Sequence, residues 1–432
     1  MKKNFLLIII FVFSFCPLGL AKTIDWKTVE KITLEINPNI RSARLNLENA
    51  KYSYYRALGV FMPAVGLSAN ASQSDNDSIT ADGRRGFGNN LNTNYTYGVN
   101  GAFTLFNGFA DYFKARQASA ELDAAKADYD RAVSDAMYKA VYQYINLMWA
   151  YERAELLESI KNTRMQNRDM VNLKYNSGNA DLGSLRRIEA DLETAKLDLR
   201  KSLRNIETVS AALSAAIGLD ENEILETSER ISNVEKIPPK PKFNDLIKTI
   251  PEYKKAQYNI ESASAQSMAA KSPFLPAVSL SGSFNQNNPE RMFSENRINN
   301  WNAGLTISYA LFNGARDYLA AKIAANNYET AKNNFIDTVN TLKAQVVLEY
   351  NSLTDACETI ALRILYLAAA ELQSEISDRK YMNGLSSYQD WYLIKNDYVN
   401  AQNALLEAKR NAALQEAAWL NFIGQKEFTK GK

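Results

Sequence analysis

Four segments of the chain alternate apolar and small polar residues with a period of two, which is the period of a β-strand. One face of each segment is apolar or aromatic, and the other carries Ser, Thr, Asn or Gly without charge. The apolar positions are Val65, Leu67, Ala69 and Ala71; Tyr95, Tyr97, Val99, Phe103 and Leu105; Val278, Leu280 and Phe284; and Trp301, Ala303, Leu305, Ile307, Tyr309 and Leu311. A soluble sheet would usually expose charged residues on its polar face, so the pattern favours transmembrane strands between lipid and water.

Four strands are too few to close a membrane barrel, which needs about eight or more. An open sheet edge cannot satisfy its backbone groups in hydrocarbon. We therefore predict that the chain oligomerises to complete a barrel. The alternative is a four-stranded sheet on a soluble core, because alternation is a weak signal in any single segment.

Two long segments without proline follow the strand pairs, from Gly108 to about Tyr175 and from Gly314 to about Tyr381. Residues within them recur at alternating steps of four and three, the spacing of a coiled coil. At about 1.5 Å per residue, each helix would reach about 100 Å. Return helices carry similar stripes, so each half is predicted to contain a long helical hairpin. The stripes are Ala118, Leu122, Ala125, Tyr129, Ala132 and Ala136; Ala324, Tyr328, Ala331, Phe335, Thr338 and Leu342; Leu192, Ala195, Leu199, Ile206, Val209 and Leu213; and Tyr398, Ala401, Leu405, Ala408, Ala412 and Trp419.

The two halves repeat each other. The Pro-Ala-Val that begins at Pro63 recurs at Pro276, and Leu-Phe-Asn-Gly, Tyr-x-x-Gly and Ile-Gly motifs of the first half recur 206 positions later, as with Gly178 and Gly384. This indicates a tandem duplication, with a longer loop between the strands of the first half. The predicted boundaries are repeats over 22–218 and 251–424 and a tail over 425–432. Residues 219–250 are irregular and form either a linker or a structured equatorial belt around the helices.

The N-terminus predicts export. Two lysines precede an apolar run over 5–15, and Gly19-Leu20-Ala21 gives a small-x-small cleavage site, so residues 1–21 are a predicted signal peptide. The run is shorter than the ~17–25 residues that span a bilayer. A lipoprotein anchor at Cys16 is the disfavoured alternative, because Phe15 precedes it. Cleavage would leave Cys357 as the only cysteine, so no intrachain disulfide is expected.

Composition argues against several kinds of chemistry. The chain has no histidine, which removes the commonest general base and most transition-metal ligands. It has no glycine-rich phosphate loop, Cys-x-x-Cys or Gly-x-Ser-x-Gly, and the acidic stretch from Asp75 to Gly83 fails as a calcium loop because Ile79 stands where an oxygen ligand is required. The charges nearly balance, with 50 Lys and Arg against 48 Asp and Glu, which argues against a nucleic-acid partner. We expect no catalytic residue, cofactor or metal site, and no enzyme.

The duplicated order of elements, the Pro-Ala-Val strand starts, the Leu-Phe-Asn-Gly strand ends and the Tyr-x-x-Gly tips resemble the TolC-like outer-membrane efflux protein family over essentially the whole mature chain. The resemblance implies a mainly α fold with transmembrane β-strands. The tandem repeat would give four strands of a trimeric 12-stranded barrel, and long coiled-coil periplasmic helices would form a tunnel with a closable aperture.

The same resemblance implies a function. The homotrimer would be the outer-membrane channel of a tripartite efflux or secretion system, a passive exit duct that docks a periplasmic adaptor (membrane fusion protein) and an inner-membrane pump. Its helices would lie in the periplasm. Drug, metal-ion and protein export are not distinguished, because the pump selects most of the substrate. The alternatives are a trimeric surface-anchored coiled-coil adhesin, which would carry one barrel module at the C-terminus, and a secreted enzyme.

The resemblance also implicates residues at the aperture. Tyr381 matches a tyrosine three positions before the tip glycine, and Asp390 matches an aspartate six positions after it that forms a carboxylate ring in the trimer. Ser184 occupies the aspartate position of the first half. Ser386 stands where an arginine helps to latch the closed state, and Leu393 replaces a second ring aspartate. The latch could then use one of three other arginines, for which a solvated helix face is the alternative: Arg379, Arg186 and Arg187.

The two hairpin tips are similar to the adaptor-docking segments of the family. Glycine at each tip suits the left-handed conformation that ends a helix. The residues assigned to docking are Tyr175, Gly178, Asp181, Leu182 and Leu185 in the first tip and Gly384, Leu385 and Tyr388 in the second.

Overall fold

The computed structural model describes residues 22–75, 91–219, 224–232, 237–288 and 297–425. The predicted signal peptide, the acidic loop around Asp77 and Asp82, and residues 426–432 lie outside the described residues. The chain divides into two compact units. One comprises Met1–Ser42, Asp130–Leu246 and Ala344–Lys432, and the other comprises Ala43–Tyr129 and Ile247–Lys343. Each unit draws on both predicted repeats, so the repeat boundaries stay a prediction from sequence.

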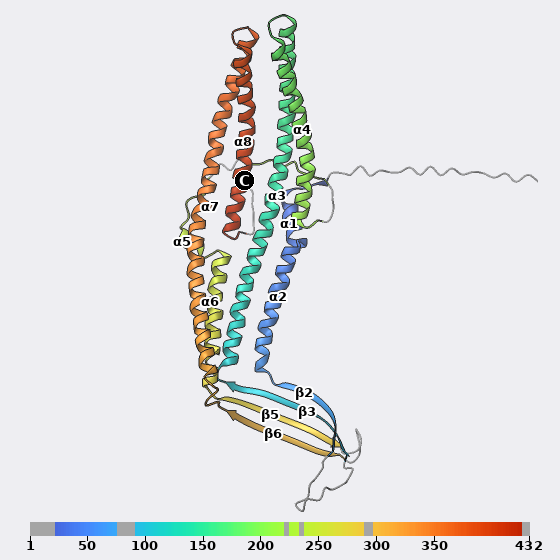
Figure 1. Cartoon of the computed structure of the whole chain (residues 1–432), viewed down its shortest axis with the longest axis vertical. Helices are drawn as coiled ribbons and strands as arrows, with labels where there is room; N and C mark the ends of the chain where they lie inside the picture. The colour runs from blue at the N-terminus through green and yellow to red at the C-terminus, as the bar shows by residue number, and fades with distance from the viewer. Residues whose placement is uncertain (1–21, 76–90, 220–223, 233–236, 289–296, 426–432) are drawn as a thin grey trace, which may run out of the picture. The chain divides into compact units, whose positions relative to one another are not determined.

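The second unit contains a four-stranded antiparallel sheet with the order β2-β3-β5-β6 (Figure 1). Its strands are β2 (Ala64–Asp75), β3 (Leu91–Asn107), β5 (Ala277–Asn288) and β6 (Ile298–Ser308). The four predicted strands are therefore confirmed. The prediction was wrong at the end of β6, where Tyr309 and Leu311 lie beyond the strand. The partner strand β5 begins at Ala277, opposite Ser308, so the chain after Ser308 has no strand to pair with.

The strand register sorts the two predicted faces into rows that cross all four strands. One row is apolar, and its end members are highly exposed, at 86% for Leu67 and 78% for Trp301. The adjacent row is polar and uncharged. The apolar row is Leu67, Val99, Phe284 and Trp301, and the polar row is Gly66, Asn100, Ser283 and Asn302. The sheet thus presents a continuous apolar surface that no described part of its own unit covers.

Helices of the second unit run up to the sheet. Helices α2 (Pro38–Leu58) and α6 (Pro251–Ala269) lead through the short 3₁₀ turns Gly59–Phe61 and Ser272–Phe274 into the first strand of each pair. After each strand pair, Gly108 and Phe109, and again Gly314 and Ala315, adopt left-handed backbone conformations with φ between 60° and 66°. The two halves therefore share a rare backbone turn at the same repeat offset.

The long helices are α3 (Ala110–Asn176) and α7 (Arg316–Met382), and the return helices are α4 (Leu182–Ile217) and α8 (Tyr388–Phe422). The α3–α4 and α7–α8 hairpins confirm the predicted helical hairpins (Figure 1). All positions of the predicted α4, α7 and α8 stripes are buried or half-buried.

The predicted stripe on α3 differs from the most buried line of that helix. Ala118, Leu122 and Ala125 are only half-buried, whereas the buried residues are Ala120, Ala124 and Ala127. Both sets follow the four-three spacing. Because this part of α3 is rich in alanine, its sequence contains two candidate stripes, and packing rather than hydropathy selects between them.

Residues after α4 pack closely on the helices of the first unit. The short strand β4 (Leu225–Glu226) pairs in parallel with β1 (Lys22–Thr23), which precedes α1 (Trp26–Ile36). The Leu225 amide donates to Ser210 Oγ at 2.7 Å, and the Ile231 amide donates to Glu152 Oε1 at 2.6 Å. Further along, before α5 (Phe243–Ile247), Pro238 O accepts a hydrogen bond from the Tyr350 hydroxyl at 3.0 Å. The described residues between the repeats are thus hydrogen-bonded to α3, α4 and α7.

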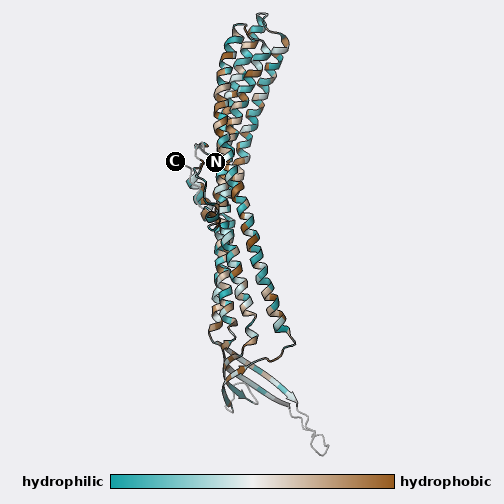
Figure 2. Ribbon diagram, turned by 90° about the vertical axis from the view of Figure 1, so that its left-hand side faces the viewer, coloured by the Kyte–Doolittle hydropathy of each residue, from teal (hydrophilic) through white to brown (hydrophobic). Residues whose placement is uncertain are grey.

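None of the helices in the described ranges combines the length and apolar character needed to cross a membrane. Figure 2 shows hydrophilic and hydrophobic residues interspersed along the helices.

Candidate functional site at the helical tips

Both hairpin tips end their first helix with the same backbone motif. Gly178 and Gly384 have φ of +76° and +74°, in the left-handed region that glycine occupies without strain. The Asn179 amide donates to Lys174 O at 2.7 Å, and the Leu385 amide donates to Lys380 O at 2.8 Å. These bonds satisfy carbonyls at the helix ends, as in a Schellman motif. A Cβ atom on either glycine would meet nothing within 4 Å, so only backbone conformation requires glycine here.

Each return helix begins with a capping pair of one aspartate and one serine. The aspartate is the N-cap in the first tip, and the serine is the N-cap in the second. In the first tip Asp181 is the N-cap of α4; it accepts from the Ser184 amide at 2.8 Å and from Ser184 Oγ at 2.7 Å. In the second tip Ser387 is the N-cap of α8, and it accepts from the Asp390 amide at 3.1 Å while its Oγ donates to Asp390 Oδ2 at 2.7 Å. Both carboxylates are exposed. The hydrogen bonds from Ser184 hold the pKa of Asp181 below its usual range.

An aromatic cluster lies beneath the tips. Tyr381 is buried, and its ring stacks on Trp391 with centroids 4.7 Å apart. Tyr388 contacts both rings, and Lys174 Nζ lies 4.6 Å from the Tyr381 centroid. Burial raises the pKa of both tyrosines. The remaining core residues come from the first hairpin, so the cluster joins the two hairpins: Val171, Leu185 and Ile188.

Polar contacts fix Trp391 from the side of α7. Its indole Nε1 donates to Asp378 Oδ1 at 2.7 Å, and Lys395 Nζ donates to Asp378 Oδ2 at 2.9 Å. Lys395 is itself buried and also donates to Ser374 Oγ at 3.0 Å. The buried ammonium is therefore paired with a carboxylate, which offsets its cost of desolvation.

The three predicted latch arginines lie in different surroundings. Arg379 pairs with Glu375 at 3.6 Å and Arg186 pairs with Glu189 at 2.9 Å, each within its own exposed helix face. Arg187 instead reaches the other hairpin, where its Nε donates to the Tyr392 hydroxyl at 3.1 Å. Of the three, Arg187 alone makes a described contact between the hairpins.

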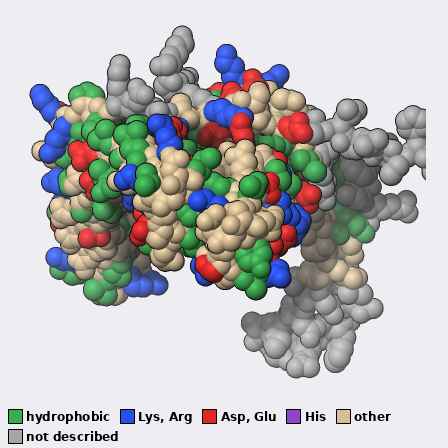
Figure 3. Space-filling model, turned by 90° about the horizontal axis from the view of Figure 1, so that it is seen from above, with side chains coloured by type: hydrophobic (Ala, Val, Ile, Leu, Met, Phe, Trp, Pro, Cys, Tyr) green, Lys and Arg blue, Asp and Glu red, His purple; other side chains and the backbone are tan. Residues whose placement is uncertain are grey.

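The residues assigned to docking divide into a surface set and a supporting set. Gly178, Asp181 and Gly384 are exposed, as are Tyr175, Leu182 and Leu385. Leu185 is buried and Tyr388 is half-buried, so these two support the tips from within. A hollow of about 770 Å³ separates the two tips. Viewed from above, hydrophobic, basic and acidic side chains are interspersed (Figure 3).

The sequence reasoning missed Trp391, Asp378, Lys395 and Lys174. Trp391 could have been found as a large apolar residue on the inner side of α8, close to the tip. The Asp378–Lys395 pair carries no local signal, because the two residues lie on different helices and meet only through the register of the hairpin.

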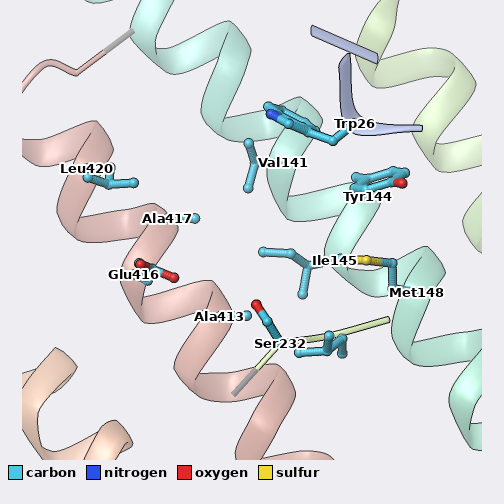
Figure 4. Close-up of a pocket in the computed structure, with 11 residues that line it drawn as sticks. Trp26, Val141, Tyr144, Ile145, Met148, Ser232, Ala413, Glu416, Ala417 and Leu420 are labelled. Atoms are coloured by element: carbon cyan, nitrogen blue, oxygen red, sulfur yellow. The ribbon is translucent and has the colours of Figure 1, made fainter. Parts of the chain in front are cut away.

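A second cavity, of about 60 Å³, lies between α1, α3 and α8 in the first unit (Figure 4). Glu416 of α8 faces Val141 and Ile145 of α3 across it, with Trp26 and Tyr144 nearby (Figure 4). Burial raises the pKa of Glu416. Within the described ranges, no group of three or more Cys, Asp or Glu residues could hold a metal ion.

Comparison with known proteins identifies the family. The family model described as outer membrane efflux protein matches residues 31–219 and 244–425. The chain belongs to the outer membrane efflux protein family. This membership confirms the resemblance inferred from sequence and places the chain among efflux channels.

Relatives of this efflux protein extend over most of its length. It is 24% identical to Toxin and drug export protein A of Aggregatibacter actinomycetemcomitans over 402 residues, and this match covers 91% of this chain and 84% of the relative. It is 20% identical to the cation efflux system protein CusC of Escherichia coli K12, over 92% of this chain and 86% of the relative. The crystal structure of the outer membrane protein VceC from Vibrio cholerae superposes with a TM-score of 0.79 at 20% identity, covering 92% of this chain and 96% of VceC. The predicted fold class was mainly α with transmembrane β-strands from a tandem repeat, and the mainly helical chain with its four-stranded antiparallel sheet confirms it.

Proposed function

We propose that the chain forms the outer-membrane exit duct of a tripartite efflux or secretion system, as a homotrimer that docks a periplasmic adaptor and an inner-membrane pump. The sheet would lie in the outer membrane and the helical tips in the periplasm. The duct is passive. Opening and closing at the tips would control transport, and the duct would catalyse no reaction.

The observation that carries this proposal is the sheet with two open edges and an apolar face. Among the described strands, nothing pairs with the outer edges of β2 and β6. In hydrocarbon every backbone N–H and C=O group needs a partner, so such a sheet requires strands from other copies. The exposed row from Leu67 to Trp301 suits contact with lipid, and the row from Gly66 to Asn302 suits contact with water. Three copies would supply the twelve strands that the family resemblance implies.

The tips support the proposed aperture and docking surface. Asp390 is exposed at the start of α8, where three copies could form a carboxylate ring. Tyr381 and Ser184 are buried and would hold the tips in shape, and Arg187 would link the two hairpins. Arg379 and Arg186 are free to contact a neighbouring protomer only by leaving their present glutamate partners. The adaptor would meet the exposed docking residues.

The names of the relatives refer to different cargoes, toxins and drugs in one and cations in the other. This accords with a duct whose cargo is selected mainly by its pump. The strand pairs of both halves meet in one sheet, which also favours a duct over an adhesin with a single terminal barrel module.

The assembly is tested by mass measurement of the purified protein in detergent, by light scattering or native mass spectrometry. We expect a trimer. A monodisperse monomer that remains folded would contradict the proposal.

Docking is tested separately by placing a photo-crosslinking residue at Leu385 in cells that contain the cognate pump and adaptor. We expect a cross-link to the adaptor. The matched control is Leu203, an exposed leucine on α4 about 30 Å from the tip at 1.5 Å per residue. Equal cross-linking from both positions, or from neither, would contradict docking at the tip.

A further inference from the structure

The buried stripe of α3 near the tips is interrupted by two polar residues. Arg164 and Asn167 are 8% and 6% exposed, and they occupy the same stripe as three apolar residues at alternating spacings of three and four: Leu157, Ile160 and Val171. In a coiled-coil seam these positions are normally apolar. The stripe therefore brings a positive charge into the interior of the first unit.

The hydrogen bonds of this pair are incomplete. Arg164 Nη2 donates to Asn396 Oδ1 of α8 at 2.6 Å. Arg164 Nη1 and Asn167 Nδ2 are both buried and have no acceptor among the described residues. A buried donor without an acceptor destabilises the folded state, and more so when it is charged. Two such donors lie one helical turn apart on one face of α3, where side chains three residues apart are neighbours.

The charge of Arg164 is also without a described counter-charge. Its only described polar partner, Asn396, is a neutral amide. The carboxylates nearest in sequence are already engaged, because Glu158 pairs with Lys161 at 2.5 Å and Asp169 pairs with Arg168 at 2.6 Å. Lys395 provides the internal contrast, since this equally buried cation is paired with Asp378 at 2.9 Å. An isolated buried charge is strongly destabilising unless it is neutralised.

We infer that Arg164 and Asn167 bind a small monovalent anion of the size of chloride between α3 and α8. The anion accepts from Arg164 Nη1 and Asn167 Nδ2 and neutralises the guanidinium, whereas a water molecule would satisfy the donors but leave the charge. Both residues are more than nine-tenths buried, which favours a monatomic ion over phosphate or a carboxylate ligand. Since Asn396 binds the same guanidinium, the anion stabilises the contact between α3 and α8.

The competing source of negative charge is Asp191 on α4. Its Oδ2 is buried without a hydrogen-bond partner, and its Oδ1 lies 3.8 Å from Arg187 Nε. A movement of this side chain toward Arg164 would replace the anion. The two arrangements predict opposite responses to chloride.

The test is thermal unfolding of the purified full-length protein in detergent, with chloride replaced stepwise by gluconate at constant ionic strength. For the wild type we expect Tm to rise by about 2 °C or more as chloride increases, because a ligand that binds only the folded state stabilises it. Arg164→Met should lose this response. Arg204→Met, which removes an exposed arginine from α4, is the matched control and should keep it. Crystals grown in bromide should show an anomalous peak beside Arg164 and Asn167.

Three results would overturn the inference. They are a wild-type Tm that does not change with chloride concentration, an equal chloride response in Arg164→Met, and bromide crystals with no anomalous peak at the site. If Asp191 supplies the charge, wild-type protein will ignore chloride and Asp191→Asn will become sensitive to it. If Arg164→Met does not fold, Asn167→Leu, which removes one donor and keeps the charge, should weaken the chloride response, and the bromide crystals decide independently.

Discussion

The Tyr381 ring lies almost parallel to the Trp391 indole, at an interplanar angle of 16°. Tyr381 lies in the last turn of α7 and Trp391 in the first turn of α8, so their stacking closes the second hairpin directly beneath its tip. Trp391 is fully buried and also donates to Asp378. This pair therefore combines apolar burial, ring stacking and a hydrogen bond at one point of the proposed aperture.

Trp391→Ala is expected to destabilise the tip by about 3–5 kcal/mol, the usual cost of removing a large buried ring. Trp391→Phe keeps a ring against Tyr381 but loses the bond to Asp378, so its cost should be smaller, about 1–3 kcal/mol. Amide hydrogen exchange over residues 371–400 measures both. Equal effects of the two variants would show that the hydrogen bond, not the stacked ring, dominates.

Asp390→Asn should reduce cation selectivity while the protein still assembles. Rings of carboxylates favour cations, and asparagine keeps an acceptor for Ser387 while it removes the charge. Single-channel recordings of the purified protein measure the reversal potential in a salt gradient. Asp397→Asn, an exposed aspartate farther along α8, is the control. Unchanged selectivity in Asp390→Asn would leave this residue with a capping role alone.

Gly178→Val and Gly384→Val together should impair export without preventing assembly. Each substitution forces a β-branched residue into a positive φ, which costs on the order of 1–3 kcal/mol, although space for the side chain is open. Gly59→Val is the matched control, because Gly59 also has open space around it but no positive φ. Export by cells that carry each variant is the measurement. Export at the wild-type level by the double variant would show that the glycine turns at the tips are not needed for docking.

Glu416→Gln should stabilise the protein at neutral pH. Burial raises the pKa of Glu416 above the ordinary value of 4.5, so ionisation costs more in the folded than in the unfolded state. The wild type therefore loses stability as pH rises from about 4.5 through the folded pKa, and the loss is complete above it. We expect Tm at pH 7.5 to rise by roughly 2 °C in Glu416→Gln, with no gain at pH 4. Glu358→Gln, at an exposed position on α7, should leave Tm unchanged at both pH values.

The sequence predicted the elements better than the contacts between them. Period-two alternation located all four strands, because each strand has one apolar and one polar face, and the glycines at 178 and 384 marked both tips through their backbone preference. Asp378 and Lys395 could not be paired from sequence, since hairpin register decides which side chains meet. Arg164 was hidden for a related reason, because a charged residue in a helical pattern is usually solvated. Its burial depends on α8 as well as on α3.

The exchanged capping pairs have a consequence for symmetry. The backbone of the two halves is similar enough that a trimer would place six nearly equivalent hairpin ends around its axis. The carboxylates break this equivalence, since Asp181 precedes the first turn of α4 while Asp390 lies within the first turn of α8. The shape of the entrance would then have approximate sixfold symmetry, whereas its charge distribution would have only threefold symmetry. A partner protein that recognises only the shape of this entrance could bind in two orientations, related by a rotation of about 60° about the axis. The alternating positions of the carboxylates would distinguish these two orientations.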